Sequence, residues 1–103
     1  MDFNVSVARD DLDSALKLIK KNNKGKKPFD LTMVFAGSTL QIETLSASVE
    51  IPVTGKARAS ITLPGQIMLR LHDTFPNKNP LNLSLSGATL KIESLSMPCR
   101  VNA

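Results

Sequence analysis

The chain has 103 residues, of which 42% are hydrophobic and 21% charged, values that are typical of one folded domain and exclude a disordered chain. It has four Phe, no Tyr and no Trp, which argues against a protein that stacks single-stranded bases on exposed rings. A single cysteine excludes an internal disulfide and a cysteine-based zinc site, and a formal net charge of +4 is compatible with an anionic partner such as nucleic acid.

No apolar run is long enough to cross a membrane, and the N-terminal MDFNVSVARDD lacks the apolar core of a signal peptide. We therefore expect a single domain over residues 1–103, a cytoplasmic location and no membrane partner.

The spacing of apolar residues changes near Asp10, from every second residue to every third or fourth. Apolar residues alternate with polar ones over residues 3–7, which predicts a strand. Asp10 is then expected to cap a helix that ends near Asn22, followed by a loop over residues 24–28. The apolar stripe of this helix is predicted to comprise Leu12, Ala15, Leu16 and Ile19.

Alternation returns from Asp30. It predicts a strand over 31–35, a tight turn at Gly37-Ser38 and a returning strand over 40–42. A further strand over 49–53, a turn at 54–56 and a strand over 57–62 complete the middle of the chain.

A second helix is predicted to open at Leu63-Pro64-Gly65, because proline is tolerated in a first helical turn. The proline-rich segment 76–80 ends it. Its apolar side is expected to comprise Ile67, Met68, Leu71 and Phe75. Three strands are predicted to follow, over 81–86, 89–94 and 97–101.

One sequence appears twice. GSTLQIETLS, from Gly37, returns fifty positions later as GATLKIESLS, from Gly87. Two copies are too few for a solenoid, which needs three or more. We therefore expect two tandem βαβββ units, residues 1–53 and 54–103, related by a pseudo-two-fold axis within one domain.

This pattern resembles a single domain of the DNA sliding clamps, the ring-shaped processivity factors of DNA replication. The resemblance rests on FNVSVARDDLDSALKLIKK, ITLPGQIMLRLHD and the repeated G-[SA]-T-L-x-I-E strands, and it covers essentially the whole chain. It implies an α+β fold of the DNA clamp type, with two helices packed on antiparallel sheets. Family rings contain six such domains joined through their sheet edges, so a one-domain chain is expected to form a homo-oligomeric ring. Duplex DNA and a DNA polymerase are the implied partners.

Basic residues form the candidate DNA-binding site. Lysines three and four positions apart share one face of the first helix, away from its apolar stripe, and such a face can follow a phosphate backbone without reading sequence. The alternative is a solvated lysine face with no ligand. The candidate DNA-binding residues are Lys17, Lys20, Lys21, Lys24, Lys26 and Lys27, with Arg70 and Lys78 from the second helix and its following loop.

No combination of residues predicts an enzyme, a cofactor or a metal site. His72 lacks a nucleophile or a second histidine beside it and is expected to be a partly exposed surface residue rather than a catalytic one. The aspartates at 10, 11 and 13 are explained by helix capping, Glu43 and Glu93 are expected far apart on outward faces, and Cys99 is expected to be a small buried hydrophobe.

Two further hypotheses remain beside a ring that encircles DNA. The chain is alternatively a clamp-fold protein–protein interaction module, monomeric or dimeric, that does not encircle DNA. It is otherwise a stand-alone structural domain with no clamp role.

Overall fold

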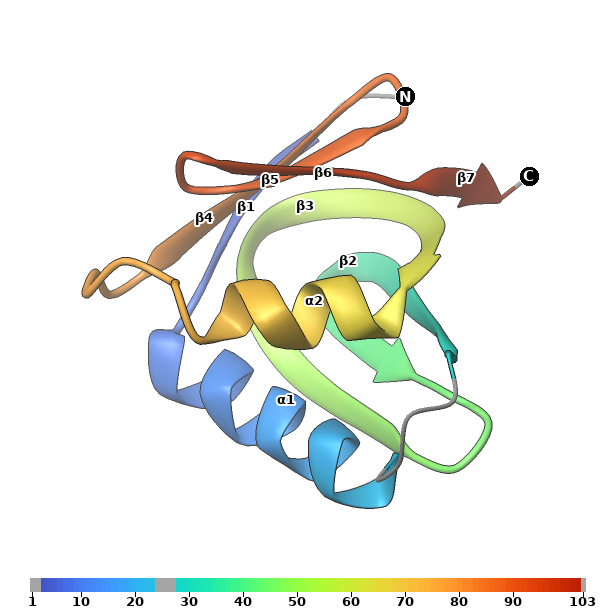
Figure 1. The fold of residues 1–103 in the computed structure, drawn as a ribbon. Coiled ribbons are helices and arrows are strands. Elements are labelled where there is room, and N and C mark those ends of the chain that lie inside the picture. The colour runs from blue at the N-terminus through green and yellow to red at the C-terminus, as the bar shows by residue number, and fades with distance from the viewer. Residues whose placement is uncertain (1–2, 24–27, 103) are drawn as a thin grey trace.

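The computed structural model describes residues 3–23 and 28–102. Two helices and antiparallel strands give an α+β fold, as the alternating periods predict (Figure 1). The elements in chain order are β1 (Phe3–Val7), α1 (Arg9–Asn22), β2 (Asp30–Glu43), β3 (Ser48–Pro64), α2 (Gly65–His72), β4 (Leu81–Ser86), β5 (Thr89–Ile92), β6 (Leu95–Pro98) and β7 (Arg100–Asn102).

The strands form one curled sheet in the order β2-β3-β1-β4-β5-β6, and β7 pairs with the second part of β3 on the edge opposite to β2. Figure 1 shows β2 and β3 curving strongly, with α1 and α2 next to each other on one side of the curl and β4 to β7 at the top of the view. Neither described helix is long and apolar enough to cross a membrane.

Each half of the chain supplies a pairing partner to the other half. β1 pairs antiparallel with β4, the strand that follows α2, with Val7 opposite Leu81. The second part of β3 pairs antiparallel with the start of β2, the strand that follows α1, with Leu63 opposite Leu31. Neither opening strand pairs with the strand that follows its own helix.

The predicted turn at Gly37-Ser38 is wrong. β2 runs through this position without reversing, because its second part continues to pair with β3 rather than folding back on its own first part. The pairing register shifts between Gly37 and Thr39. Gly37 has φ +73°, a conformation that suits a β-bulge as well as a turn.

The predicted turn at residues 54–56 is also wrong. β3 continues through this segment, where it leaves β2, and Thr54 pairs with Ser6 of β1. Gly55 has φ +111°, and a Cβ at this position would lie 3.3 Å from the side chain of Val5. The glycine therefore permits both the bend and the close approach of β1.

The helices bury the predicted stripes with two corrections. Leu12, Ala15, Leu16 and Ile19 of α1 are buried, as predicted. The expected cap at Asp10 is wrong, because the helix begins at Arg9 after Ala8, which provides no side-chain cap. On α2, Met68 and the following Phe75 are buried and Leu71 is half-buried, whereas Ile67 is 36% exposed and does not belong to the apolar side.

The last strands follow the prediction more closely. Gly87, with φ +60°, lies in the turn between β4 and β5, where Ser86 pairs with Thr89. The strand predicted over 97–101 is divided into β6 and β7 at Cys99, whose backbone N–H donates to the carbonyl oxygen of Ala88 (2.9 Å). Cys99 is half-buried against the core, so its predicted burial is only partial.

Candidate nucleic-acid interface

The lysine face of α1 points into solvent. Lys17, Lys20 and Lys21 are all exposed, on the side of the helix away from the buried stripe. Lys20 and Lys21 lie in the last helical turn, where a positive charge also complements the partial negative charge of the helix end. The predicted residues Lys24, Lys26 and Lys27 lie outside the described residues.

The second helix contributes less charge. Arg70, in the last turn of α2, is exposed. Lys78 lies in the loop before β4 and is 68% exposed, but its Nζ lies 3.3 Å from Oε1 of Glu93. Lys78 is therefore already paired with a carboxylate, whereas the lysines of α1 are not paired with any described residue.

Glu93 joins the loop before β4 to the turn between β5 and β6. Its Oε2 accepts a hydrogen bond from the backbone N–H of Asn82 (2.9 Å), and its own N–H donates to the Asn82 carbonyl (2.9 Å). The hydrogen bond from the Asn82 N–H to the carboxylate, assisted by Lys78, holds the pKa of Glu93 below its ordinary value, against the opposing effect of desolvation. The sequence predicted only that Glu93 lies on an outward strand face, far from Glu43, and did not predict its pairing with Lys78.

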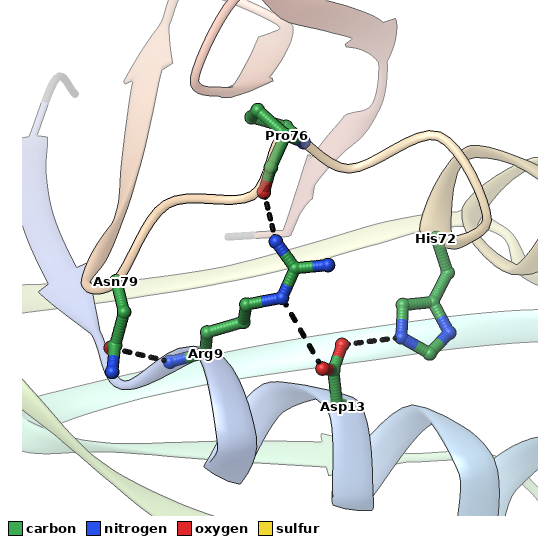
Figure 2. A network of polar contacts seen from close by, with 5 residues as sticks. All are labelled: Arg9, Asp13, His72, Pro76 and Asn79. Atoms are coloured by element: carbon green, nitrogen blue, oxygen red, sulfur yellow. Dashed lines mark hydrogen bonds and ion pairs between the residues drawn. The ribbon is translucent and has the colours of Figure 1, made fainter.

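A polar network ties the start of α1 to the end of α2 (Figure 2). Nε2 of His72 lies 2.7 Å from Oδ1 of Asp13, and Nε of Arg9 lies 3.5 Å from Oδ2 of the same carboxylate. The Arg9 guanidinium also donates to the carbonyl oxygen of Pro76, and the Arg9 backbone N–H donates to Oδ1 of Asn79 (3.1 Å).

The network corrects one prediction and adds to another. His72 is partly exposed, as predicted, with 13% of its side chain accessible, but it is also bound to Asp13 and packs edge-on against Phe75, with ring centroids 5.3 Å apart. Asp13 does not cap the helix but joins two helices. The only sequence signal was the i, i+4 spacing of Arg9 and Asp13; the bond to His72 crosses 59 residues.

Sequence reasoning also missed a cavity of about 670 Å³ between the end of α1 and the β2–β3 turn. Its lining includes Phe29, Asp30, Glu43 and Leu45. Leu45 is fully exposed, with a relative accessibility of 109%, whereas Leu95, its counterpart in the repeat, is half-buried against the core. The exposed side chain of Leu45 is therefore part of the wall of this cavity.

No group of three or more His, Cys, Asp or Glu within residues 3–23 and 28–102 is placed to hold a metal ion. Comparison with known proteins adds no relative: no protein family matches the chain, and no curated protein matches it significantly.

Proposed function

We propose that this protein is a sliding-clamp-like processivity protein, which assembles as a homo-oligomeric ring and contacts the backbone of duplex DNA without reading its sequence. The observation that carries the proposal is the exposed lysine face of α1, with Lys17, Lys20 and Lys21 projecting from a helix that lies beside α2. Unpaired lysines on one surface attract phosphates by charge and by release of counterions.

The exchange of strands between the two halves supports a clamp-like repeat. β1 pairs with β4 as the second part of β3 pairs with the start of β2. In both pairings an apolar residue at the end of the opening strand lies opposite a leucine of the repeat: Val7 opposite Leu81, and Leu63 opposite Leu31. A pseudo-two-fold axis between the halves would produce this relationship, and two helices on one side of the sheet would follow from it.

The sheet offers two ends through which copies would join. β2 and β6 stand at the ends of the strand order, and an exposed strand edge presents backbone groups that can pair with another chain. Joining the edge of one copy to the opposite edge of the next is a head-to-tail contact, which closes into a ring when the rotation permits. Six copies would reproduce the six-domain rings of sliding clamps, with a DNA polymerase as a further partner.

The DNA contact is tested with two matched double variants. Lys17→Glu/Lys20→Glu on α1 and Lys56→Glu/Arg58→Glu on β3 change the net charge equally, and all four residues are exposed. Retention of duplex DNA at low salt should fall about tenfold or more for the α1 variant and much less for the β3 variant. Equal losses would move the contact away from α1.

The ring is tested by light scattering coupled to gel filtration. The proposal requires a particle near six times the 11.2 kDa chain mass. A strictly monomeric protein at micromolar concentration would rule out the ring.

One observation favours a second candidate, a clamp-fold protein–protein interaction module that does not encircle DNA. Leu45 is fully exposed beside the cavity of about 670 Å³, and an apolar residue exposed next to a hollow suits a protein ligand better than a phosphate backbone. A monomer or dimer without DNA retention in the two experiments above would support this candidate against the ring.

A further inference from the structure

The charges of α1 are segregated along its length. Its start, from Arg9 to Asp13, carries one arginine and three aspartates, whereas the segment from Lys17 to Lys21 carries three lysines and no acidic residue. This distribution complements the helix dipole. It also gives the outer surface of the helix an acidic end and a basic end.

Asp13 binds both Arg9 and His72 near the acidic end. Its carboxylate lies 3.5 Å from Nε of Arg9 and 2.7 Å from Nε2 of His72 (Figure 2). The carbonyl oxygen of Pro76 holds the Arg9 guanidinium from another side, and the side chain of Arg9 is only 25% exposed. Arg9 is therefore occupied within the protein rather than presented to a ligand.

We propose that Asp13 is a positioning residue that confines contact with a polyanion to the Lys17–Lys21 half of α1. This inference rests on the proposed DNA contact and specifies its location. A phosphate backbone that approaches the start of α1 meets three carboxylates, which repel it. Arg9 does not offset this repulsion, because its positive charge is paired with Asp13. A backbone approaching the second half meets lysines that are unpaired among the described residues.

Asp10 provides a matched control for Asp13. It lies three positions earlier on the same helix, is exposed, and has no ion-pair or side-chain hydrogen-bond partner among the described residues. Asp10→Asn and Asp13→Asn each remove one negative charge, but only Asp13→Asn also removes the carboxylate that neutralises Arg9. Binding of a 20-base-pair duplex should therefore be at least about threefold tighter for Asp13→Asn than for Asp10→Asn at 50 mM salt, with one additional phosphate contact in the salt dependence.

A double variant separates release of Arg9 from the loss of charge at residue 13. Arg9→Gln/Asp13→Asn leaves the net charge unchanged, so it should return the affinity and the salt slope to those of the unmodified protein, because the guanidinium that Asp13 had neutralised is no longer present. A purely structural role of Asp13 would not produce this reversal. Equal binding by the two single variants would overturn the inference.

A milder pair covers the case in which Asp13→Asn does not fold. Arg9→Gln and Lys20→Gln each remove one positive charge from α1. We expect Arg9→Gln to retain duplex DNA nearly as well as the unmodified protein and Lys20→Gln to bind several-fold more weakly. Equal losses would show that Arg9 contacts DNA and would overturn the inference while leaving the DNA contact intact. If the unmodified protein retains no duplex at all, the proposed function fails, and the inference fails with it.

Discussion

The backbone N–H of Gly65 donates a hydrogen bond to the carbonyl oxygen of Phe29 (2.8 Å), and the ring of Phe29 occupies the space that a Cβ at Gly65 would fill. Next to this contact, Asp30 pairs with Pro64 as β2 and β3 come together. The first residue of α2 is thus fixed against the segment that leads into β2, and the missing side chain allows the close approach.

Gly65→Ala should destabilise the protein by about 1–3 kcal/mol, because the new methyl group displaces the Phe29 ring. Urea unfolding measures the change. Combined with Phe29→Ala, the substitution should cost less than the sum of the two single effects, since the smaller side chain removes the overlap. Additive effects would show that the ring is not the cause.

Glu93 should make stability depend on pH in the acid range. Its pKa lies below the ordinary value of 4.5, so its contribution is fully present above that value and is lost as pH falls through the lowered pKa. The stability difference between the unmodified protein and Glu93→Gln should therefore be present at pH 6 and shrink toward pH 3. Urea titrations at several pH values measure it.

Glu43→Gln is the control for this measurement, because Glu43 is the repeat counterpart of Glu93 but has no ion-pair partner among the described residues. The same pH dependence for both variants would contradict the assignment to the Asn82 hydrogen bond and the Lys78 pair.

Leu16 and Leu18 test the orientation of α1. Leu16 is completely buried and Leu18 is 43% exposed, two positions along the same helix. Leu16→Ala should cost about 2–5 kcal/mol through lost burial and a cavity, whereas Leu18→Ala should stay within about 0.5 kcal/mol. Chemical denaturation of both variants makes the comparison, and similar losses would mean that the helix packs with a different face.

Cys99 should react slowly with iodoacetamide in the folded protein. Burial raises the pKa of its thiol above the ordinary value of 9.0, which lowers the fraction of the reactive thiolate at a given pH. The alkylation rate at pH 8 should increase on unfolding in urea, as followed by mass spectrometry. An equal or faster rate in the folded state would show an activated thiol instead.

The spacing of apolar residues predicted the helices better than the strands, because a strand is defined by its pairing with another strand. The stripe of α1 was predicted from spacing alone, because a helix is closed by its own backbone hydrogen bonds. The two glycine segments show the limit. Gly37 and Gly87 precede nearly identical sequences and both have positive φ, yet only Gly87 lies in a turn. The difference is set by the distant strand β3, which keeps β2 extended.

The sequence predicted the lysine face of the candidate interface but not the contacts between distant segments around it. The exposed face with Lys17 and Lys21 follows from helical spacing. The bond between Asp13 and His72 does not, because it depends on two helices meeting across 59 residues of chain. Pairing of Lys78 with Glu93 similarly depends on the loop before β4 meeting the β5–β6 turn.

The exchange of strands makes each half of the chain depend on the other for its pairing. A fragment ending at Val53 would retain β1 and β2 but lose β4 and the second part of β3, their partners. The complementary fragment would lack the same pairings from the other side. Neither piece should fold alone, and mixing the two should restore helical and strand signal through fragment complementation. The repeat is thus visible in the sequence as two units, but we expect the unit of cooperative folding to be the whole chain.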